Sequence, residues 1–151
     1  MTKLAYLECP TGIAGDMCLG ALIHAGVPLE YLIEKLKGLG IEQEYKLSVQ
    51  TLRRNSQQAT KLHVDVLSEH QHQNQHSHHH GRHLPQIEQL ITKAELPSRA
   101  EAWSLAIFRQ LAAAEGAVHG VPPEQVHFHE VGAVDSIVDI IGTAICIACE
   151  S

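Results

Sequence analysis

Apolar residues recur at intervals of three and four along much of the chain, the spacing that places them on one face of a helix. This pattern predicts a helix over 16–26, a second over 28–40, a third over 85–95 and a longer one over 97–118. The chain is therefore expected to be rich in helix. Within the longest helix, the spacing assigns one shared face to Trp103, Ile107, Leu111 and Ala114.

Strand patterns occupy other apolar segments. Residues 3–9, KLAYLEC, are short and apolar and are followed at once by PTG, which predicts a buried strand. Alternation over 45–53 and 60–67 predicts two further strands, which the polar residues between them join as an antiparallel hairpin. From about Ala133 the chain is apolar nearly all round, which predicts a helix that is buried or docks on another surface. We therefore expect a single α/β or α+β two-layer domain over 1–151, with packed helices and a small mixed sheet.

Residues 68–83, SEHQHQNQHSHHHGRH, break these patterns because they contain almost no residue that enters a core. Such a composition predicts a mobile loop. Neutral imidazole is a good ligand for nickel, copper and zinc, so an adaptable loop rich in histidine predicts a collector that binds metal ions loosely. A passive linker is the alternative interpretation. The candidate metal ligands in the loop are His70, His72, His76, His78, His79, His80 and His83.

Composition narrows the class of protein. Of the 151 residues, 44% are hydrophobic and 19% are charged, and the formal net charge at pH 7 is -6. These values are typical of a globular domain, and the acidity argues against a nucleic-acid-binding protein. No apolar run reaches the roughly 18 residues of a membrane span, and the first residues lack the pattern of a secretory signal. The four cysteines do not make a dense disulfide framework, so we expect a cytoplasmic protein with reduced thiols.

The segment TGIAGD, residues 11–16, lies between a predicted strand and a predicted helix. Glycines let a backbone approach a ligand closely, and free amides at a helix start attract anions. Gly12, Gly15 and Asp16 are therefore candidates for binding a phosphate, with Asp16 capping the helix or holding a metal that bridges to the phosphate. The simpler interpretation is a tight turn with an aspartate cap. No Gly-Lys-Ser or Gly-Lys-Thr follows, so the segment is not a Walker loop.

The segment VHFHEVGAVDSIVDII, residues 126–141, places two histidines and three carboxylates beside a core-forming helix. In an extended chain His127 and His129 point to the same side, while Asp135 and Asp139 share one face of the following helix. Imidazoles with one or two carboxylates form a mixed ligand set that suits a divalent transition metal. The alternative is that an aspartate caps the helix and the histidines are only hydrogen-bonded. The joint pattern favours a functional site.

Three stretches together resemble the nickel insertion protein of nickel-pincer cofactor biosynthesis, the LarC family: LAYLECPTGIAGDMCLGAL, the histidine-rich loop ending in HHHGRHL, and VHFHEVGAVDSIVDIIGTA. The resemblance covers about residues 4–149 and implies that the chain is the N-terminal part of a longer protein. It implies a CTP-dependent nickel insertase that forms carbon–nickel and sulfur–nickel bonds on a bis-thiocarboxylated pyridinium mononucleotide. The product is the cofactor of lactate racemase and related enzymes. CTP and Mg²⁺ or Mn²⁺ are expected to bind mainly through the C-terminal part.

Carried onto this sequence, the resemblance implies that the histidine loop gathers Ni²⁺ and that Gly12, Gly15 and Asp16 lie near a phosphate. The family usually has an aspartate where this chain has Glu8, and Phe-Ser where it has Pro10 and Thr11. Because of these departures, no direct ligand role is assigned to residue 8. The catalytic residues implied near the metal or the substrate are Asp16, His127, His129, Glu130 and Asp135.

Two other classes of function stay open. The same histidines would serve a nickel metallochaperone or store with no chemistry of its own, and the apolar last helix would suit an interaction subunit. Storage alone does not need residues 127–139, which favours the enzyme. The expected partners are the C-terminal part of the family protein and the pyridinium mononucleotide, with neither nucleic acid nor membrane, and with self-association left open.

Overall fold

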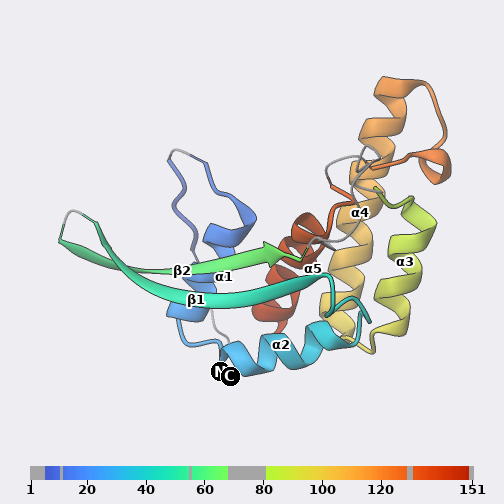
Figure 1. Ribbon diagram of the computed structural model, residues 1–151. Helices are drawn as coiled ribbons and strands as arrows, with labels where there is room; N and C mark the ends of the chain where they lie inside the picture. Colours follow the sequence, from blue (N-terminus) through green and yellow to red (C-terminus); the bar gives the residue numbers. More distant parts are fainter. Residues whose placement is uncertain (1–5, 11, 55, 68–80, 129–130, 150–151) are drawn as a thin grey trace, which may run out of the picture.

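The computed structural model describes residues 6–10, 12–54, 56–67, 81–128 and 131–149 (Figure 1). A long curved β-hairpin projects from one side of a group of packed helices. This arrangement confirms the α+β class. The elements in chain order are α1 (Gly15–His24), α2 (Leu29–Lys37), β1 (Tyr45–Arg54), β2 (Gln57–Val66), α3 (Leu84–Lys93), α4 (Ser98–His119), the 3₁₀ turn η1 (Pro123–Gln125) and α5 (Val134–Ala148).

Helix α5 is the centre of the described structure, because α1, α2, α4 and β2 all contact it. Its residues Ile137, Val138, Ile141 and Ile145 are fully buried. Burial of each large aliphatic side chain contributes about 1.5–3 kcal/mol, so this one helix supplies much of the hydrophobic stabilisation. The prediction of a buried apolar helix is confirmed, and its start at Val134 agrees with the sequence pattern.

The predicted hairpin is confirmed. Strands β1 and β2 pair antiparallel from Tyr45 opposite Val66 to Arg54 opposite Gln57. The strands extend further into the polar linking segment than the alternation indicated, because backbone pairing does not require apolar side chains. Helix α1 lies on β2, and a Cβ at Gly20 would stand 2.5 Å from the carbonyl oxygen of Thr60. Glycine at this position therefore allows the close approach.

The strand predicted over residues 3–9 is wrong for its described part. Residues 6–9 have no strand structure, and Tyr6 and Leu7 are 87% and 52% exposed. Within the described residues the sheet holds only β1 and β2, so the expected mixed sheet is not formed there. An apolar run becomes a strand only where a partner offers backbone hydrogen bonds, and no described segment pairs with residues 6–9.

The helix predicted over 97–118 is confirmed as α4, but the predicted face is not its most buried one. Ile107 on that face is 40% exposed, whereas Phe108 is fully buried. Small residues decide the orientation, because they let α4 approach its neighbours closely. The buried face is made of Ala100, Ser104, Phe108, Ala112 and Gly116. Within the described residues, no helix is long and apolar enough to cross a membrane.

Candidate functional site

The last residues of the histidine-rich segment lie against the segment that precedes α5. The Phe128 backbone N–H donates to the carbonyl oxygen of Arg82 at 3.2 Å, and His83 forms an isolated antiparallel bridge with His127. Glycine allows the two backbones to meet, since a Cβ at Gly81 would collide with the Phe128 carbonyl. Two motifs that are far apart in the sequence are therefore joined by backbone contacts.

The side chain of Arg82 holds this junction to the hairpin. Its Nη2 donates to both carboxylate oxygens of Glu44, at 2.7 and 2.8 Å, just before β1 begins. Its Nη1 lies 3.5 Å from the carbonyl oxygen of Gly132. The Arg82 side chain is only 19% exposed, so its charge is largely removed from water and depends on these partners. Three segments are fixed to one another by one guanidinium group.

The imidazole rings of His83 and His127 meet edge to face, with centroids 4.7 Å apart and an interplanar angle of 79°. The Nδ1 of His83 lies 3.1 Å from the carbonyl oxygen of Val126. A carbonyl only accepts, so Nδ1 donates in this contact, and in the neutral ring that metal binding requires, Nε2 carries the lone pair. A backbone carbonyl that orients the ring in this way is typical of metal-binding histidines.

Alternating burial along residues 126–128 indicates an extended backbone, the condition under which His127 and His129 point to the same side. Val126 and Phe128 are buried at 2% and 0% exposure, while His127 between them is half-buried. The buried neighbours fix the backbone, so His127 is held in a defined position. The face assigned to His129 stays a prediction, because His129 and Glu130 lie outside the described residues.

A group of three carboxylates lies where α1 and α5 begin. Asp16 and Asp135 are in the first turns of the two helices, and Asp139 is one turn further along α5. Asp139 accepts a hydrogen bond from the Asp16 backbone N–H, and its Oδ1 is buried without a hydrogen-bond partner in the described structure. Burial, followed by the nearby charges of Asp16 and Asp135, raises the pKa of Asp139 to about 6.

Gly15 makes the contact between the two helices possible. A Cβ at residue 15 would collide with the side chain of Asp139. Gly15 does not need a left-handed backbone, whereas Gly12 has a φ of +90° and its N–H donates to Cys9 across a tight turn. Glycine is therefore favoured at these two positions of the predicted phosphate loop for different reasons: residue 15 leaves space for Asp139, and residue 12 has a left-handed backbone.

The prediction that Asp16 caps α1 is wrong. The N-cap residue is Ala14, and the Asp16 carboxylate accepts from the N–H of Met17 instead. The carboxylate of Asp139 binds an amide at the helix start, the position predicted for a phosphate. Three negative side chains also repel a phosphate unless a cation lies between them. Phosphate binding here stays a prediction and now requires such a cation.

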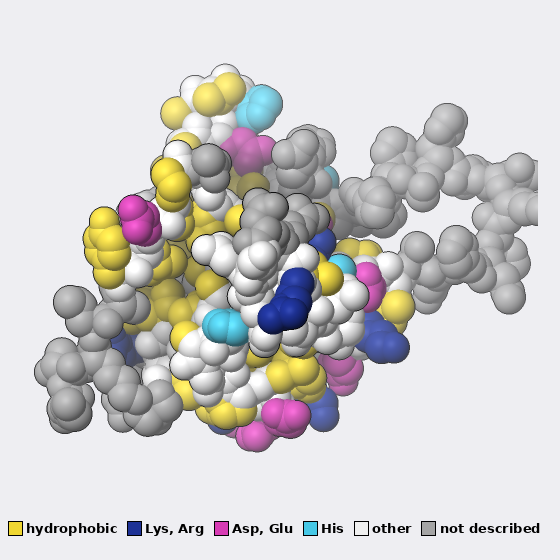
Figure 2. All heavy atoms as spheres, turned by 90° about the vertical axis from the view of Figure 1, so that its left-hand side faces the viewer, with side chains coloured by type: hydrophobic (Ala, Val, Ile, Leu, Met, Phe, Trp, Pro, Cys, Tyr) yellow, Lys and Arg dark blue, Asp and Glu magenta, His cyan; other side chains and the backbone are white. Residues whose placement is uncertain are grey.

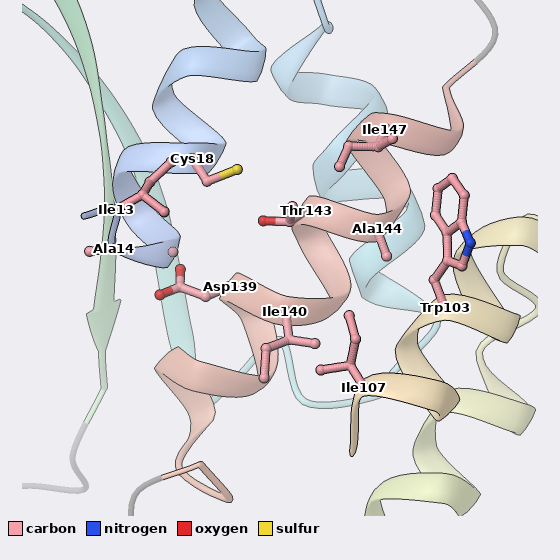
Figure 3. Close-up of a pocket in the computed structure, with 11 residues that line it drawn as sticks. Ile13, Ala14, Cys18, Trp103, Ile107, Asp139, Ile140, Thr143, Ala144 and Ile147 are labelled. Carbon is pink, nitrogen blue, oxygen red and sulfur yellow. The ribbon is translucent and has the colours of Figure 1, made fainter. Parts of the chain in front are cut away.

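A cavity of about 570 Å³ lies between α1, α4 and α5 and borders this cluster of three carboxylates at Asp139 (Figure 3). Asp139 and Cys18 lie toward the α1 side, and Trp103 and Ile107 project from α4 on the other side. Burial raises the pKa of the Cys18 thiol, although a hydrogen bond with Thr143 opposes the shift. All four cysteines are free thiols. The cavity wall is otherwise almost entirely apolar.

The sequence pattern offered Asp139 only as a second carboxylate for a metal site beside His127 and His129 and did not include it among the catalytic residues, and it gave no sign of the cavity. The spacing of Asp135 and Asp139 was the available signal for the acid. The cavity depends on how α4 is rotated relative to α5. The face of α4 that the sequence pattern predicted is displaced by one residue from the face that is buried. The predicted face of α4 lines the cavity through Trp103 and Ile107.

The described residues do not complete a metal centre, since they hold no group of three or more His, Cys, Asp and Glu side chains close enough for one ion. They bring together His83 with His127 and, separately, Asp16 with Asp135 and Asp139. The other predicted ligands and catalytic residues lie outside the described part of the chain: His70, His72, His76, His78, His79, His80, His129 and Glu130.

Comparison with known proteins gives one consistent result. The family model described as "Nickel insertion protein" matches residues 5–149. A "Putative nickel insertion protein" of Nostoc sp. is 68% identical over 145 residues, which cover 96% of this chain and 34% of the relative. The protein of the same name from Gloeothece citriformis is 65% identical over 150 residues, covering 96% and 36%. The chain therefore spans about a third of the length of these curated relatives, and no solved structure matches it.

Proposed function

This chain belongs to the nickel insertion protein family, and we propose that it gathers Ni²⁺ and positions it for insertion into an organic cofactor. The proposed acceptor is pyridinium-3,5-bisthiocarboxylic acid mononucleotide, the precursor of the nickel-pincer cofactor of lactate racemase. The reaction consumes CTP in the cytoplasm, and Mg²⁺ or Mn²⁺ assists it. CTP binds mainly to the remaining two-thirds of the family protein, which acts together with this chain.

One observation carries the proposal. The histidine-rich segment ends at His83, and its last residues are joined by backbone hydrogen bonding to the segment that holds His127. A nickel ion held by the histidine loop is therefore released beside a histidine that the core keeps in a fixed position. A store without chemistry has no use for this junction, because loosely bound ions exchange with solvent from any part of a loop.

The two groups of histidines have different tasks in this proposal. Ligands in the loop, His70 to His80, collect the ion in several exchanging geometries. The nitrogens of His83 and His127, with His129 and Glu130 next in the chain, receive it in a defined geometry. Preorganised ligands lose less entropy on binding, so the ion moves toward the fixed set.

The cluster of three carboxylates, Asp16, Asp135 and Asp139, supplies acid–base chemistry in this proposal. When a carbon–nickel bond replaces a carbon–hydrogen bond on the acceptor ring, one proton is released and needs an acceptor. A carboxylate whose pKa is raised to about 6 takes up a proton more readily near neutral pH than an ordinary aspartate. We assign this role to Asp139, whose pKa is kept high first by burial and then by the charges of Asp16 and Asp135.

The function is tested by CTP-dependent incorporation of Ni²⁺ into the pyridinium precursor. The 151-residue chain is assayed by itself and after co-expression with the remaining two-thirds of the Nostoc relative. We expect turnover only from the combination and only with CTP. If the chain binds Ni²⁺ but the combination inserts none, the chain is a metallochaperone or store. Sustained turnover by the chain alone would contradict the division of labour proposed here.

A further inference from the structure

The cavity beside the carboxylate group is also an exposed apolar groove. Ile13, Ile107 and Ile147 line it and are 48%, 40% and 46% exposed. They come from three separate segments, the turn before α1, α4 and the end of α5, and all three line the same cavity. A space-filling view shows hydrophobic side chains gathered at the surface on one side of the hairpin (Figure 2). Contiguous exposed apolar surface of this kind marks an interaction site.

Helix α5 explains why the groove exists. One side of the helix is buried against α1, α2 and α4, yet the opposite side is apolar too, with Ile140, Ala144 and Ile147 on the groove wall. After Asp139 the helix contains no charged residue up to Ala148. A helix at the surface of a protein normally carries polar residues on the side that faces solvent. In α5 both sides are apolar, as in a helix that is buried on both sides.

The length of the relatives indicates what covers the second side. The chain corresponds to 34% and 36% of the Nostoc and Gloeothece proteins, so these proteins contain roughly twice as much further chain that is attached to the same domain. We propose that the groove is the docking site for an apolar segment from this remaining two-thirds of the family protein. The inference rests on the proposed function in one respect: it takes the remaining two-thirds of the family protein as the part that acts together with this chain.

The polar groups of the groove define the partner further. Asp139 lies at one end, and its Oδ1 is buried without a hydrogen-bond partner in the described structure. A docked segment therefore carries an apolar stripe with a hydrogen-bond donor or a cationic side chain next to the carboxylate. Because Gly15, Cys18 and Asp139 belong to the wall, the segment also borders the carboxylate group and excludes water from it.

A second copy of this chain fits the groove less well. A two-fold symmetric contact requires a self-complementary surface. The described residues that line the groove include no Lys or Arg, so pairing through it would bury the Asp139 carboxylate of each copy without a charged partner, which is costly. A partner that is different in sequence can supply the missing donor.

The test uses the 151-residue chain, tagged and co-expressed with the remaining two-thirds of the Nostoc relative, without Ni²⁺, CTP or precursor. Ile107→Glu places a charge in the groove. Val118→Glu places the same charge on the same helix outside the groove, where the side chain is already 82% exposed. We expect the wild-type chain and Val118→Glu to copurify with the partner, and Ile107→Glu to retain at least tenfold less, since a buried unpaired charge costs more than the 1.4 kcal/mol that equals a factor of ten.

A second measurement reports on the groove directly. The chain contains one tryptophan, Trp103, and it lines the groove. Labelling the chain with 5-fluorotryptophan gives one ¹⁹F resonance, which should shift in the purified complex. Equal copurification of both variants, an unmoved resonance, or no complex with the wild-type chain would overturn the proposal. A homodimer in sedimentation velocity that Ile107→Glu dissociates would overturn it in favour of a second copy. None of these readouts depends on nickel insertion, so they test the docking proposal independently of the proposed function.

Discussion

The rings of His83 and His127 are in edge-to-face contact, with centroids 4.7 Å apart, although one ends the histidine-rich segment and the other precedes α5. The contact is supported by the backbone bridge between the same two residues and by Arg82, which binds Glu44 and Gly132. The last histidine of the histidine-rich segment therefore lies next to a histidine that the core holds in position.

Replacing Arg82 by alanine should destabilise the protein by about 1–3 kcal/mol, because it leaves a partly buried Glu44 carboxylate without its charged partner. The matched control is Arg109→Ala, which removes an ion pair with Glu88. The Arg109 side chain is 61% exposed, and its loss should cost about 0–1 kcal/mol. Urea unfolding of both variants measures the difference. Equal effects would mean that Arg82 does not hold the junction.

Replacing Gly15 by alanine gives a test in which two effects have opposite signs. Helix propensity alone favours alanine over glycine by about 0.5–1 kcal/mol. The added Cβ would collide with Asp139, however, and forcing extra volume into a packed contact costs about 1–3 kcal/mol. We expect net destabilisation in thermal or urea unfolding. A variant more stable than the wild type would show that α1 and Asp139 are not in close contact.

Much of the fold was predictable from the sequence because its signals are local. The hairpin, the helices and the buried α5 follow from periodicity, and the 3₁₀ turn at Pro123 follows from a proline. The strand over 3–9 failed because pairing depends on another segment. The rotation of α4 failed because small residues such as Ala112 and Gly116, which lack a strong apolar signal, set its packing.

The site was predictable in its residue types but not in its grouping. The patterns placed His127 and His129 in one candidate site with Asp135, and treated the glycine loop as a separate phosphate site. The structure instead brings Asp16 to Asp135 and Asp139, and brings His83 to His127. Such contacts depend on how α1 packs against α5 and on where the histidine loop returns, and neither has a signature within one short stretch of sequence.

Replacing Asp139 by asparagine should change how stability depends on pH. Because the pKa of Asp139 is raised to about 6, the folded state binds a proton more tightly than the unfolded state, whose carboxyl titrates near 3.8. The contribution of Asp139 to the stability of the wild-type protein is therefore lost as pH rises from about 4 to about 6. Asparagine carries no charge, so the melting temperature of the variant relative to the wild type should be higher at pH 7 than at pH 4. An unchanged difference between the two pH values would contradict the raised pKa.

The central claim is that the loop collects nickel while the fixed histidines place it, and two variants separate these roles. Deleting residues 70–80 should remove most of the bound Ni²⁺, as measured by calorimetric titration. The double change His127→Ala with His129→Ala should leave most of that capacity, because the loop histidines are intact. Circular dichroism checks that both variants are folded.

The decisive measurement is nickel incorporation into the pyridinium precursor at saturating Ni²⁺, with CTP and the remaining two-thirds of the family protein present. The loop deletion should retain activity, because free nickel then replaces the collector. The double histidine variant should lose insertion, because His83 and Glu130 alone do not make a complete ligand set to receive the ion. If instead the loop deletion abolishes insertion at saturating Ni²⁺ while the double variant works normally, the assignment of collecting and placing roles is wrong.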